Sequence, residues 1–436
     1  MKYIQEAFDT NWVVPLGPNV NGFEDDLKRF VTSVVNSKEK ESSFIDEGYP
    51  QSILPHEDNP DNLWKDSLPN LEDKRVVALC SGTAAVHLSL IALGVKAGDE
   101  VICQSFTFCA SSHPVTYLGA TPVFVDSEKE TWNMDPSLLE EAIKDRISKT
   151  GKKPKAIIVV YLYGMPAKIK EILAVADKYN IPVVEDAAEG LGSRYNGQVC
   201  GTFGEYGVLS FNGNKMITTS GGGALICPNE AARTDVMFYA TQAREGYPYY
   251  QHEKIGYNYR LSNVCAGIGR GQMTVLDEHI AHHRHIAHLY EEAFSKIDGI
   301  TFHANPSPIF DSNYWLNTMT IDPSVKVKGQ ENAYQSTVKG AVGGAAGVIH
   351  AVADAHTDCE PNANIEAMRV YLDKANIESR PLWKPMHKQP CYQNCPAYIT
   401  GVSESLFKIG MCLPSGPLVT DDDVNYIVET IKSAIE

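Results

Sequence analysis

The sequence lacks several features that would define its class. No apolar run reaches the roughly 20 residues that a membrane-spanning helix requires. The opening residues, MKYIQEAFDTNW, contain two acidic side chains and no apolar core segment, so we expect no signal peptide there. Positive charge is scarce, because 38 Lys and Arg stand against 54 Asp and Glu, for a net charge of −16. This balance argues against nucleic acid or an anionic membrane as a partner.

The ten cysteines form no regular framework. Cys80, Cys103 and Cys227 lie in apolar runs, which is typical of buried thiols in a reducing compartment. Cys391 and Cys395 are an isolated pair whose spacing does not fit a zinc site. Together with the missing membrane span and signal peptide, this pattern predicts a cytoplasmic protein.

No Gly-x-Gly-x-x-Gly motif follows a predicted strand, which argues against a dinucleotide-binding dehydrogenase. From Arg75 onward, short apolar segments alternate instead with helical patterns. Strands are predicted at 75–80, 99–104, 121–126, 155–164 and 181–186, and helices at 81–93, 108–119, 135–147 and 165–180. This alternation predicts an α/β fold with a mostly parallel sheet covered on both faces, whose ligands bind beyond the carboxyl ends of the strands.

With 436 residues the chain is long enough for two domains. We expect a turn or strand-like arm at 1–20, a large domain at 21–289 and a small C-terminal domain at 290–436. Asn21 is predicted to cap a helix over 22–35, and a long helical pattern runs from Asn263 to Lys296. Residues 37–74 and 328–364 are predicted insertions without an assigned function.

Lys215 lies in a glycine-rich bend between two apolar runs, Gly207 to Phe211 and Ala224 to Cys227. Two interpretations fit this stretch when it is taken alone. One is a hairpin whose lysine points into solvent. The other is a desolvated lysine that forms a Schiff base with a carbonyl group.

Two further features bear on this choice. The segment SGTAA joins a strand to a helix, where the backbone N–H groups of Gly82, Thr83 and Ala84 can bind an anion, although simple N-capping also explains it. Asp186 ends an apolar strand, where its carboxylate must either meet a cation or donors, or cap a helix. A pyridoxal phosphate enzyme needs an anion cradle, an acid for the pyridinium nitrogen and a lysine, and this chain has them in that order.

The histidine-rich segment HIAHHRHIAH is a separate candidate site. His279, His282 and His283 share one helix face and could hold a metal. No carboxylate or cysteine completes an evident ligand set, so we expect a solvated helix face and no metal.

Six segments resemble the DegT/StrS-type nucleotide-sugar aminotransferases, over most of residues 1–30 and 75–436. They are LCSGTAAVHLSL, SFTFCAS, VEDAAEGLGS, GTFGEYGVLSFNGNKMITTSGGGAL, GYNYRLSN and IESRPLWKPMH. The resemblance implies an aspartate aminotransferase-like structure (fold type I of the pyridoxal phosphate enzymes) with a large domain and a smaller α+β domain. The segments NGNKMITTSGGG and SRPLWKPMH most resemble enzymes that aminate a 4-keto-6-deoxy sugar on UDP-N-acetylhexosamine, for surface polysaccharide or glycan synthesis.

The resemblance also implies residue roles. Lys215 would bind pyridoxal phosphate as a Schiff base and later act as general base and acid, while Asp186 would pair with the pyridinium nitrogen. Phe108, which the residue pattern alone would place in the core, would stack on the ring, and Glu189 would lie near the ring hydroxyl. The phosphate would be bound by Gly82, Thr83 and Ser210, with Asn258 and Arg260 contributed by the second subunit of a homodimer. The sugar-nucleotide end would be lined by Arg380, Trp383, Lys384 and His387.

The resemblance implies a sugar nucleotide, with UDP as the expected nucleotide, and glutamate as the expected amino donor. Three alternatives remain. The substrate could be a 3-keto sugar nucleotide. A sugar dehydratase of the same family is disfavoured, because those relatives usually have histidine in place of Lys215. A non-catalytic regulatory protein on the same fold is disfavoured by the intact lysine, aspartate and phosphate cradle.

Overall fold

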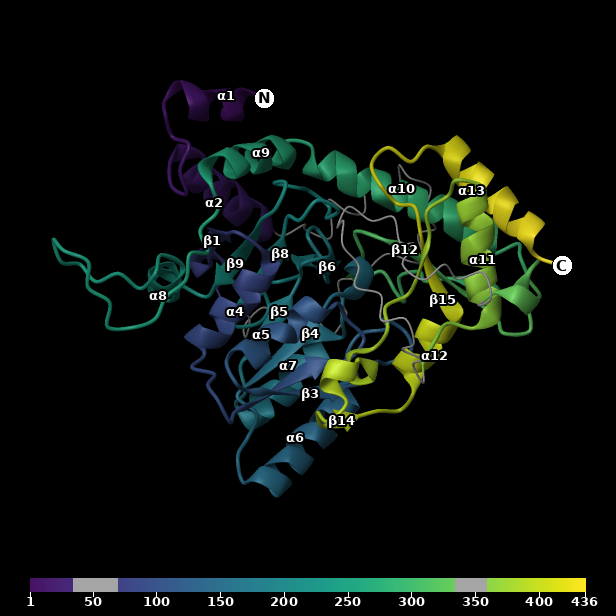
Figure 1. The fold of residues 1–436 in the computed structure, drawn as a ribbon, viewed down its shortest axis with the longest axis horizontal. Coiled ribbons are helices and arrows are strands. Elements are labelled where there is room, and N and C mark those ends of the chain that lie inside the picture. Colours follow the sequence, from purple (N-terminus) through teal and green to yellow (C-terminus); the bar gives the residue numbers. More distant parts are fainter. Residues whose placement is uncertain (34–69, 334–358) are drawn as a thin grey trace, which may run out of the picture.

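A computed structural model describes residues 1–33, 70–333 and 359–436, so most of the two predicted insertions lies outside the described residues. Its central feature is an eight-stranded mixed sheet (Figure 1). In spatial order the strands are β1 (Arg75–Leu79), β9 (Gly223–Cys227), β8 (Tyr206–Ser210), β5 (Val183–Asp186), β4 (Ala156–Val160), β2 (Glu100–Gln104), β3 (Thr121–Val125) and β14 (Ala397–Tyr398). All pairs from β8 to β14 are parallel, and only the two pairs made by β9 are antiparallel. The predicted α/β fold is confirmed.

Successive side chains of each strand point to opposite faces, so the sheet separates two hydrophobic cores. One core is covered by α2 (Pro18–Val31), α6 (Pro136–Thr150), α7 (Ile169–Tyr179), α9 (Asn263–Met273) and the start of α10 (Leu276–Phe294). The other is covered by α4 (Gly82–Ala92), α5 (His113–Tyr117) and α8 (Glu230–Ala240). The strand directions bring the carboxyl ends of β1, β5 and β8 to one edge of the sheet, next to the start of β9.

A second, antiparallel sheet lies toward the C-terminus, with its own hydrophobic core (Figure 1). Its strands are β10 (Ile300–Phe302), β12 (Asn317–Ile321), β15 (Gly410–Leu413) and β13 (Arg380–Pro381). The end of α10, α11 (Ala363–Lys374) and α13 (Asp421–Ala434) contribute to this core. A small third sheet consists of β11 (Phe310–Asp311), β6 (Arg194–Tyr195) and β7 (Gln198–Val199).

The chain returns from the second sheet to the first after β13. Met386 and Tyr392, which lie in the short 3-10 helices η7 (Met386–Lys388) and η8 (Pro390–Tyr392), join the core beneath α4. β14 then pairs in parallel with β3 at the sheet edge, and α12 (Val402–Ile409) follows. No sequence pattern predicted this return, because β14 is only two residues long and makes its contacts with a distant strand.

Four predictions about the N-terminal arm and the helices differ from the structure. Residues 1–20 contain a helix, α1 (Lys2–Asp9), rather than only a turn or strand-like arm. This helix buries Ala7 and contacts α9. Asn21 caps no helix, because α2 starts at Pro18 with Gly17 as its N-cap, and proline is well suited to a first helical turn.

The other two differences concern helix continuity. The helix predicted at 108–119 is broken into η4 (Cys109–Ser111) and α5, since Pro114 lacks the N–H that a continuous helix needs. The pattern from Asn263 to Lys296 forms two helices, α9 and α10, interrupted at Thr274 and Val275. α10 restarts with Asp277 and Glu278 in its first turn, where negative charge is favourable.

Candidate active site

Lys215 lies in the loop that joins the antiparallel strands β8 and β9. The hairpin interpretation is therefore right for the backbone, but the side chain points inward and is 13% exposed. Its Nζ donates a hydrogen bond to Glu189 Oε1 over 3.1 Å and lies 3.9 Å from the centroid of the Trp315 ring. An amine held between a carboxylate and an aromatic face fits a desolvated reactive lysine.

Asp186 ends β5 and is buried. Its Oδ2 accepts a hydrogen bond of 2.6 Å from the Ser111 hydroxyl, and its Oδ1 accepts one of 3.2 Å from the Ala188 N–H. No helix begins after this residue, so it does not act as a helix cap. Burial raises the pKa of Asp186, whereas the Ser111 hydrogen bond and the positive charge of Lys215 oppose that rise. A cationic ring nitrogen would supply the charge that this carboxylate requires.

The turn between β1 and α4 combines capping with free donors. The Ser81 hydroxyl accepts the Ala84 N–H over 3.0 Å, which is N-capping. Among the hydrogen bonds of the described residues, none uses the N–H of Gly82 or Thr83 as donor, so both remain available to an anion at the helix N-terminus. A Cβ added at Gly82 would lie 3.0 Å from Ser210 Cβ, which places the Ser210 side chain against this turn.

Phe108 is not a core residue, since it is 53% exposed. Its ring centroid lies 5.5 Å from that of Trp383, which in turn lies 5.0 Å from the Tyr163 ring. The backbone N–H of Trp383 also donates to the Tyr163 hydroxyl over 2.9 Å. The structure therefore brings Phe108 and Trp383, which are far apart in the sequence, to one aromatic cluster.

The sequence analysis missed three residues of the candidate site. They are Ser111, which bonds to Asp186, and the aromatic residues Tyr163 and Trp315. Tyr163 adopts a φ of 56°, a left-handed conformation unusual for a non-glycine residue, and its N–H donates to Glu189 Oε2 over 2.8 Å. Glu189 thus bonds to both Lys215 and Tyr163, and burial raises its pKa against the charge of Lys215. A serine after a strand and aromatics within apolar segments resemble ordinary turn and core residues, so no local pattern identified them.

The segment that carries Asn258 and Arg260 lies beside the end of β1 in its own chain, next to the turn proposed to bind phosphate. The Cys80 N–H donates to Tyr259 O over 2.8 Å, which attaches this segment to the end of β1. Arg260 pairs with Glu24 over 2.7 Å and donates to Ala78 O over 3.0 Å, whereas Asn258 is exposed. Within one chain the Arg260 charge is therefore balanced by Glu24.

The residues predicted to bind the sugar nucleotide differ in exposure and in hydrogen-bond partners. Arg380 lies on β13, where it pairs with Glu378 over 2.7 Å and its side chain is 44% exposed. Lys384 is half-buried. His387 bonds through Nδ1 to Ser105 Oγ over 2.7 Å and through Nε2 to Glu404 over 3.4 Å, and burial lowers its pKa. Both imidazole nitrogens thus have partners inside the protein.

A family comparison agrees with this geometry. The model of the DegT/DnrJ/EryC1/StrS aminotransferase family matches residues 69–342 and 330–432. The chain belongs to this family. It is therefore an enzyme, a pyridoxal phosphate-dependent nucleotide-sugar aminotransferase, and not a regulatory protein without catalysis.

Several relatives extend along the chain of this aminotransferase. EpsN of Bacillus subtilis (strain 168), provisionally named a pyridoxal phosphate-dependent aminotransferase, is 40% identical over 433 residues, covering 98% of this chain and 91% of EpsN. GDP-perosamine synthase of Escherichia coli O157:H7 is 34% identical over 81% of this chain and 83% of its own. The UDP-N-acetyl-3-dehydro-alpha-D-glucosamine 3-aminotransferase of Acidithiobacillus ferrooxidans is 36% identical over 51% of this chain and 58% of its own.

The fold of the aminotransferase is shared with solved structures. The crystal structure of a DegT DnrJ EryC1 StrS aminotransferase from Brucella abortus matches with a TM-score of 0.76 and 24% identity, covering 99% of this chain and 94% of that one. At this level of identity the likeness shows the fold, which is the predicted fold type I architecture.

The aminotransferase site fits pyridoxal phosphate. The free N–H groups of Gly82 and Thr83 and the neighbouring Ser210 hydroxyl suit a phosphate. The buried carboxylate of Asp186 suits a protonated ring nitrogen, and Lys215 supplies the amine.

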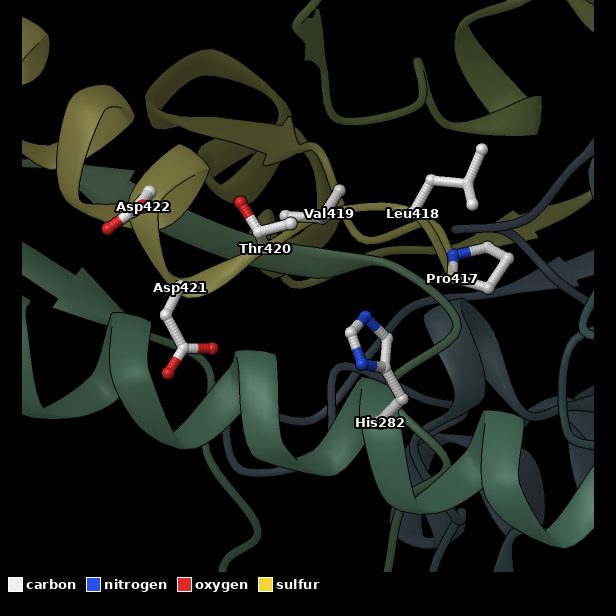
Figure 2. Close-up of a pocket in the computed structure, with 7 residues that line it drawn as sticks. All are labelled: His282, Pro417, Leu418, Val419, Thr420, Asp421 and Asp422. Atoms are coloured by element: carbon white, nitrogen blue, oxygen red, sulfur yellow. The ribbon is translucent and has the colours of Figure 1, made fainter.

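A separate surface hollow of about 570 Å³ lies between α10 and the loop that enters α13 (Figure 2). It is lined by His282, Pro417, Leu418, Val419, Thr420, Asp421 and Asp422, none of which was predicted to belong to the active site. In the described ranges no three His, Cys, Asp or Glu side chains are arranged to hold a metal, His279, His282 and His283 included. Nor does any helix there combine the length and apolar character needed to cross a membrane.

Proposed function

We propose that this enzyme transfers an amino group from glutamate to a 4-keto-6-deoxy sugar on UDP-N-acetylhexosamine. The observation that carries the chemistry is the inward-facing amine of Lys215, in contact with Glu189 and close enough to Asp186 for their charges to interact. The 4-keto assignment is supported by the segments around Lys215 and from Ser379 to His387, which resemble enzymes of that type. A 3-keto sugar nucleotide is the second candidate, because a relative with that activity in its name is 36% identical over half of this chain.

Each site residue has a proposed task. Pyridoxal phosphate, when bound, supplies an electron sink for the carbon that loses a proton. Lys215 would hold the cofactor and afterwards carry that proton, and Asp186 would stay ionised against the ring nitrogen. Phe108 would cover one face of the cofactor ring, and Glu189 would lie near the ring hydroxyl. The phosphate is held by Gly82, Thr83 and Ser210.

The residues proposed to bind the sugar nucleotide belong to the segment from Arg380 to His387, which carries Trp383. The cationic side chains of Arg380 and Lys384 suit a diphosphate, and the indole of Trp383 suits a base or sugar face. His387 contributes by holding this segment in place, since its bonds to Ser105 and Glu404 connect η7 to the end of β2 and to α12. This arrangement supports a nucleotide-linked substrate rather than a free sugar.

We further propose a homodimer in which Asn258 of each chain reaches the phosphate of the partner's site. The supporting observation is that Asn258 is exposed, while its neighbours Tyr257 and Tyr259 stack on each other with ring centroids 5.0 Å apart. Arg260 shares this segment, and its pairing with Glu24 holds it against β1.

A substrate panel tests the proposal. Purified enzyme with glutamate is offered 4-keto-6-deoxy and 3-keto sugars, each linked to UDP or GDP, and the aminated product is examined by NMR. We expect turnover of the UDP-linked 4-keto sugar to exceed that of the 3-keto sugar. Preferential amination at carbon 3, or of the GDP sugar, would overturn the corresponding part of the assignment while leaving the enzyme class intact.

A further inference from the structure

The amine of Lys215 lies over the face of the Trp315 indole ring. Lys215 Nζ lies 3.9 Å from the ring centroid, and Glu189 Oε1 lies 3.1 Å from the same nitrogen. Lys215 is 13% exposed and Trp315 only 4% exposed, so little water competes for the charge. An ammonium group is attracted to the negative face of an indole, and this attraction grows when water is excluded.

Hydrogen bonds hold Trp315 in this place. Its Nε1 donates over 2.7 Å to the carbonyl oxygen of Asn214, the residue before Lys215. Its backbone N–H donates over 2.8 Å to Asn313 Oδ1, and Asn313 Nδ2 donates over 2.8 Å to the Glu189 carbonyl oxygen. The ring, the lysine loop and the backbone of Glu189 are thereby connected as one unit.

We propose that Trp315 is a positioning residue that holds the protonated ε-amine of Lys215 whenever this amine is not bonded to the cofactor. The proposal rests on the assignment of Lys215 as the catalytic lysine. When Lys215 takes a proton from the donor carbon, the C–H bond breaks, an N–H bond forms and the electron pair stays on the carbon side. The ammonium that results lies between the Glu189 carboxylate and the Trp315 ring. The aromatic face can stabilise its charge without accepting the proton.

Two substitutions separate the ring face from the other contacts of Trp315. Trp315→Phe and Trp315→Leu both lose the hydrogen bond to Asn214, but only the phenylalanine keeps an aromatic face. A difference in the labelling rate of Lys215 between these two variants therefore measures the contribution of the aromatic face. Trp383→Leu is the matched control for access, because Trp383 lies 6.3 Å from Trp315 in the same cluster but is not the ring beneath Lys215.

The test uses full-length protein without cofactor. Lysine amines are methylated with formaldehyde and cyanoborohydride at several pH values between 7 and 11, because only the neutral amine reacts. Peptide mass spectrometry then gives the labelling rate of Lys215. Near neutral pH we expect Trp315→Leu to label Lys215 about 2- to 30-fold faster than the unchanged protein, and Trp315→Phe to show a smaller increase. The excess should shrink toward the highest pH, where most lysine amines are neutral. The exposed Lys155 is the internal reference.

The acidic groups that act on Lys215, Glu189 and Asp186, are the same in all variants, so their titration cancels in the comparison. If Trp315→Leu labels Lys215 faster by the same factor at pH 11 as at pH 7, the variant has made Lys215 more accessible, and the proposal is overturned. An equal increase in Trp383→Leu would have the same meaning. Identical rates in the Phe and Leu variants, with melting curves showing that both are folded, would also overturn the proposal. Borohydride reduction of the loaded enzyme, followed by peptide mapping, tests separately whether Lys215 bears the cofactor.

Discussion

The surroundings of Lys215 bring together three separate parts of the chain. Glu189 follows β5, Trp315 precedes β12 and Lys215 itself lies between β8 and β9. Neither the lysine nor its loop could create this environment, because a free lysine in a glycine-rich bend would be solvated. The surrounding residues therefore determine what the amine can do.

Replacement of Lys215 tests its role directly. In Lys215→Ala we expect turnover to fall to trace levels, because the variant lacks the amine that lies beside Glu189 and Trp315. The melting temperature should stay near that of the unchanged enzyme, since the residue contributes chemistry more than packing. Circular dichroism and a coupled glutamate assay provide the two measurements, with exposed Lys155→Ala as the control. Substantial remaining activity would show that another lysine carries the cofactor.

Asp186→Asn removes one negative charge while keeping the shape of the side chain. The ring nitrogen then loses its anionic partner, and we expect kcat to fall by about 100-fold or more. Cofactor binding should persist through the phosphate contacts, which an equilibrium titration of the apoprotein can measure. A near-normal kcat with full cofactor occupancy would remove Asp186 from this role.

At the scale of elements, the phosphate turn is held by the strand that follows the lysine loop. A Cβ added at Gly223, the first residue of β9, would lie 2.4 Å from Gly82 N and Ser81 C. Only a glycine allows this close approach of β9 to the turn. The last glycine of the GGG segment therefore positions the donors of the anion site.

Gly223→Ala should displace the phosphate turn. We expect the dissociation constant for pyridoxal phosphate to rise about 10- to 100-fold, because charge-assisted hydrogen bonds to the phosphate are lost or lengthened. Gly221→Ala is a matched control, since a Cβ at Gly221 meets no atom within 4 Å. Fluorescence titration of the two apoproteins makes the comparison, and equal affinities would contradict this role of Gly223.

Asp126 links the large sheet to α12. This buried carboxylate, which follows β3, accepts backbone N–H groups around the start of the helix, with donor distances of 2.9, 2.7, 3.2 and 3.0 Å from Thr400, Gly401, Val402 and Ser403. Burial by itself would raise the pKa of Asp126, but hydrogen bonds from Ser403, Ser127 and Gly401 outweigh it and hold the pKa below its ordinary value.

Asp126→Asn should lower the free energy of unfolding by about 3 kcal/mol at pH 7. Because the folded state lowers the pKa of Asp126, its contribution is present above the unfolded pKa of about 3.9 and is lost as pH falls below it. The difference from the unchanged enzyme should therefore shrink below about pH 4.

Urea unfolding at several pH values measures this difference. Asp135→Asn is the control, because the half-buried Asp135 caps α6 and asparagine caps about as well. The loss there should be at most a few tenths of a kcal/mol. A difference for Asp126→Asn that does not change with pH would contradict the assigned ionisation.

At the scale of the whole molecule, large exposed apolar side chains concentrate in two segments. The N-terminal segment exposes Phe8, Val13, Val14 and Leu16, and the segment that follows α8 exposes Tyr247, Tyr249, Tyr250 and Ile255. Such concentrations are typical of surfaces that contact another protein. They fit the proposed homodimer, in which a second copy covers them.

Subunit mixing tests the shared site. Neither Lys215→Ala nor Asn258→Ala alone should retain full activity, but a mixed dimer would contain one site with both residues intact. Random exchange should then restore roughly a quarter of the normal activity. Native mass spectrometry confirms the exchange, and absence of recovery in verified mixed dimers would place Asn258 in its own chain's site or in none.

Local patterns were sufficient for much of this protein. β1 to β5, α4, α6 and α7 follow from apolar periodicity and capping residues. Asp186 was singled out by its place at a strand end and Lys215 by its glycine-rich loop between two strands, and their roles stay predictions. The breaks in the helices at 108–119 and 263–296 were missed because the apolar pattern continues through them. The position of Trp315 could not be predicted, because its contact with Lys215 joins residues 100 positions apart.

The sequence alone determined the fold class, the order of phosphate turn, aspartate and lysine, and the motifs of the family, because these depend on neighbouring residues. The tertiary structure decided which way Lys215 points, that Phe108 is exposed, that Glu24 balances Arg260 and that β14 returns to the large sheet. These outcomes depend on contacts between segments far apart in the chain, which bury side chains and pair charges. Burial, hydrogen bonds and ion pairs act through space, so residues far apart in the chain act together only once the fold has formed.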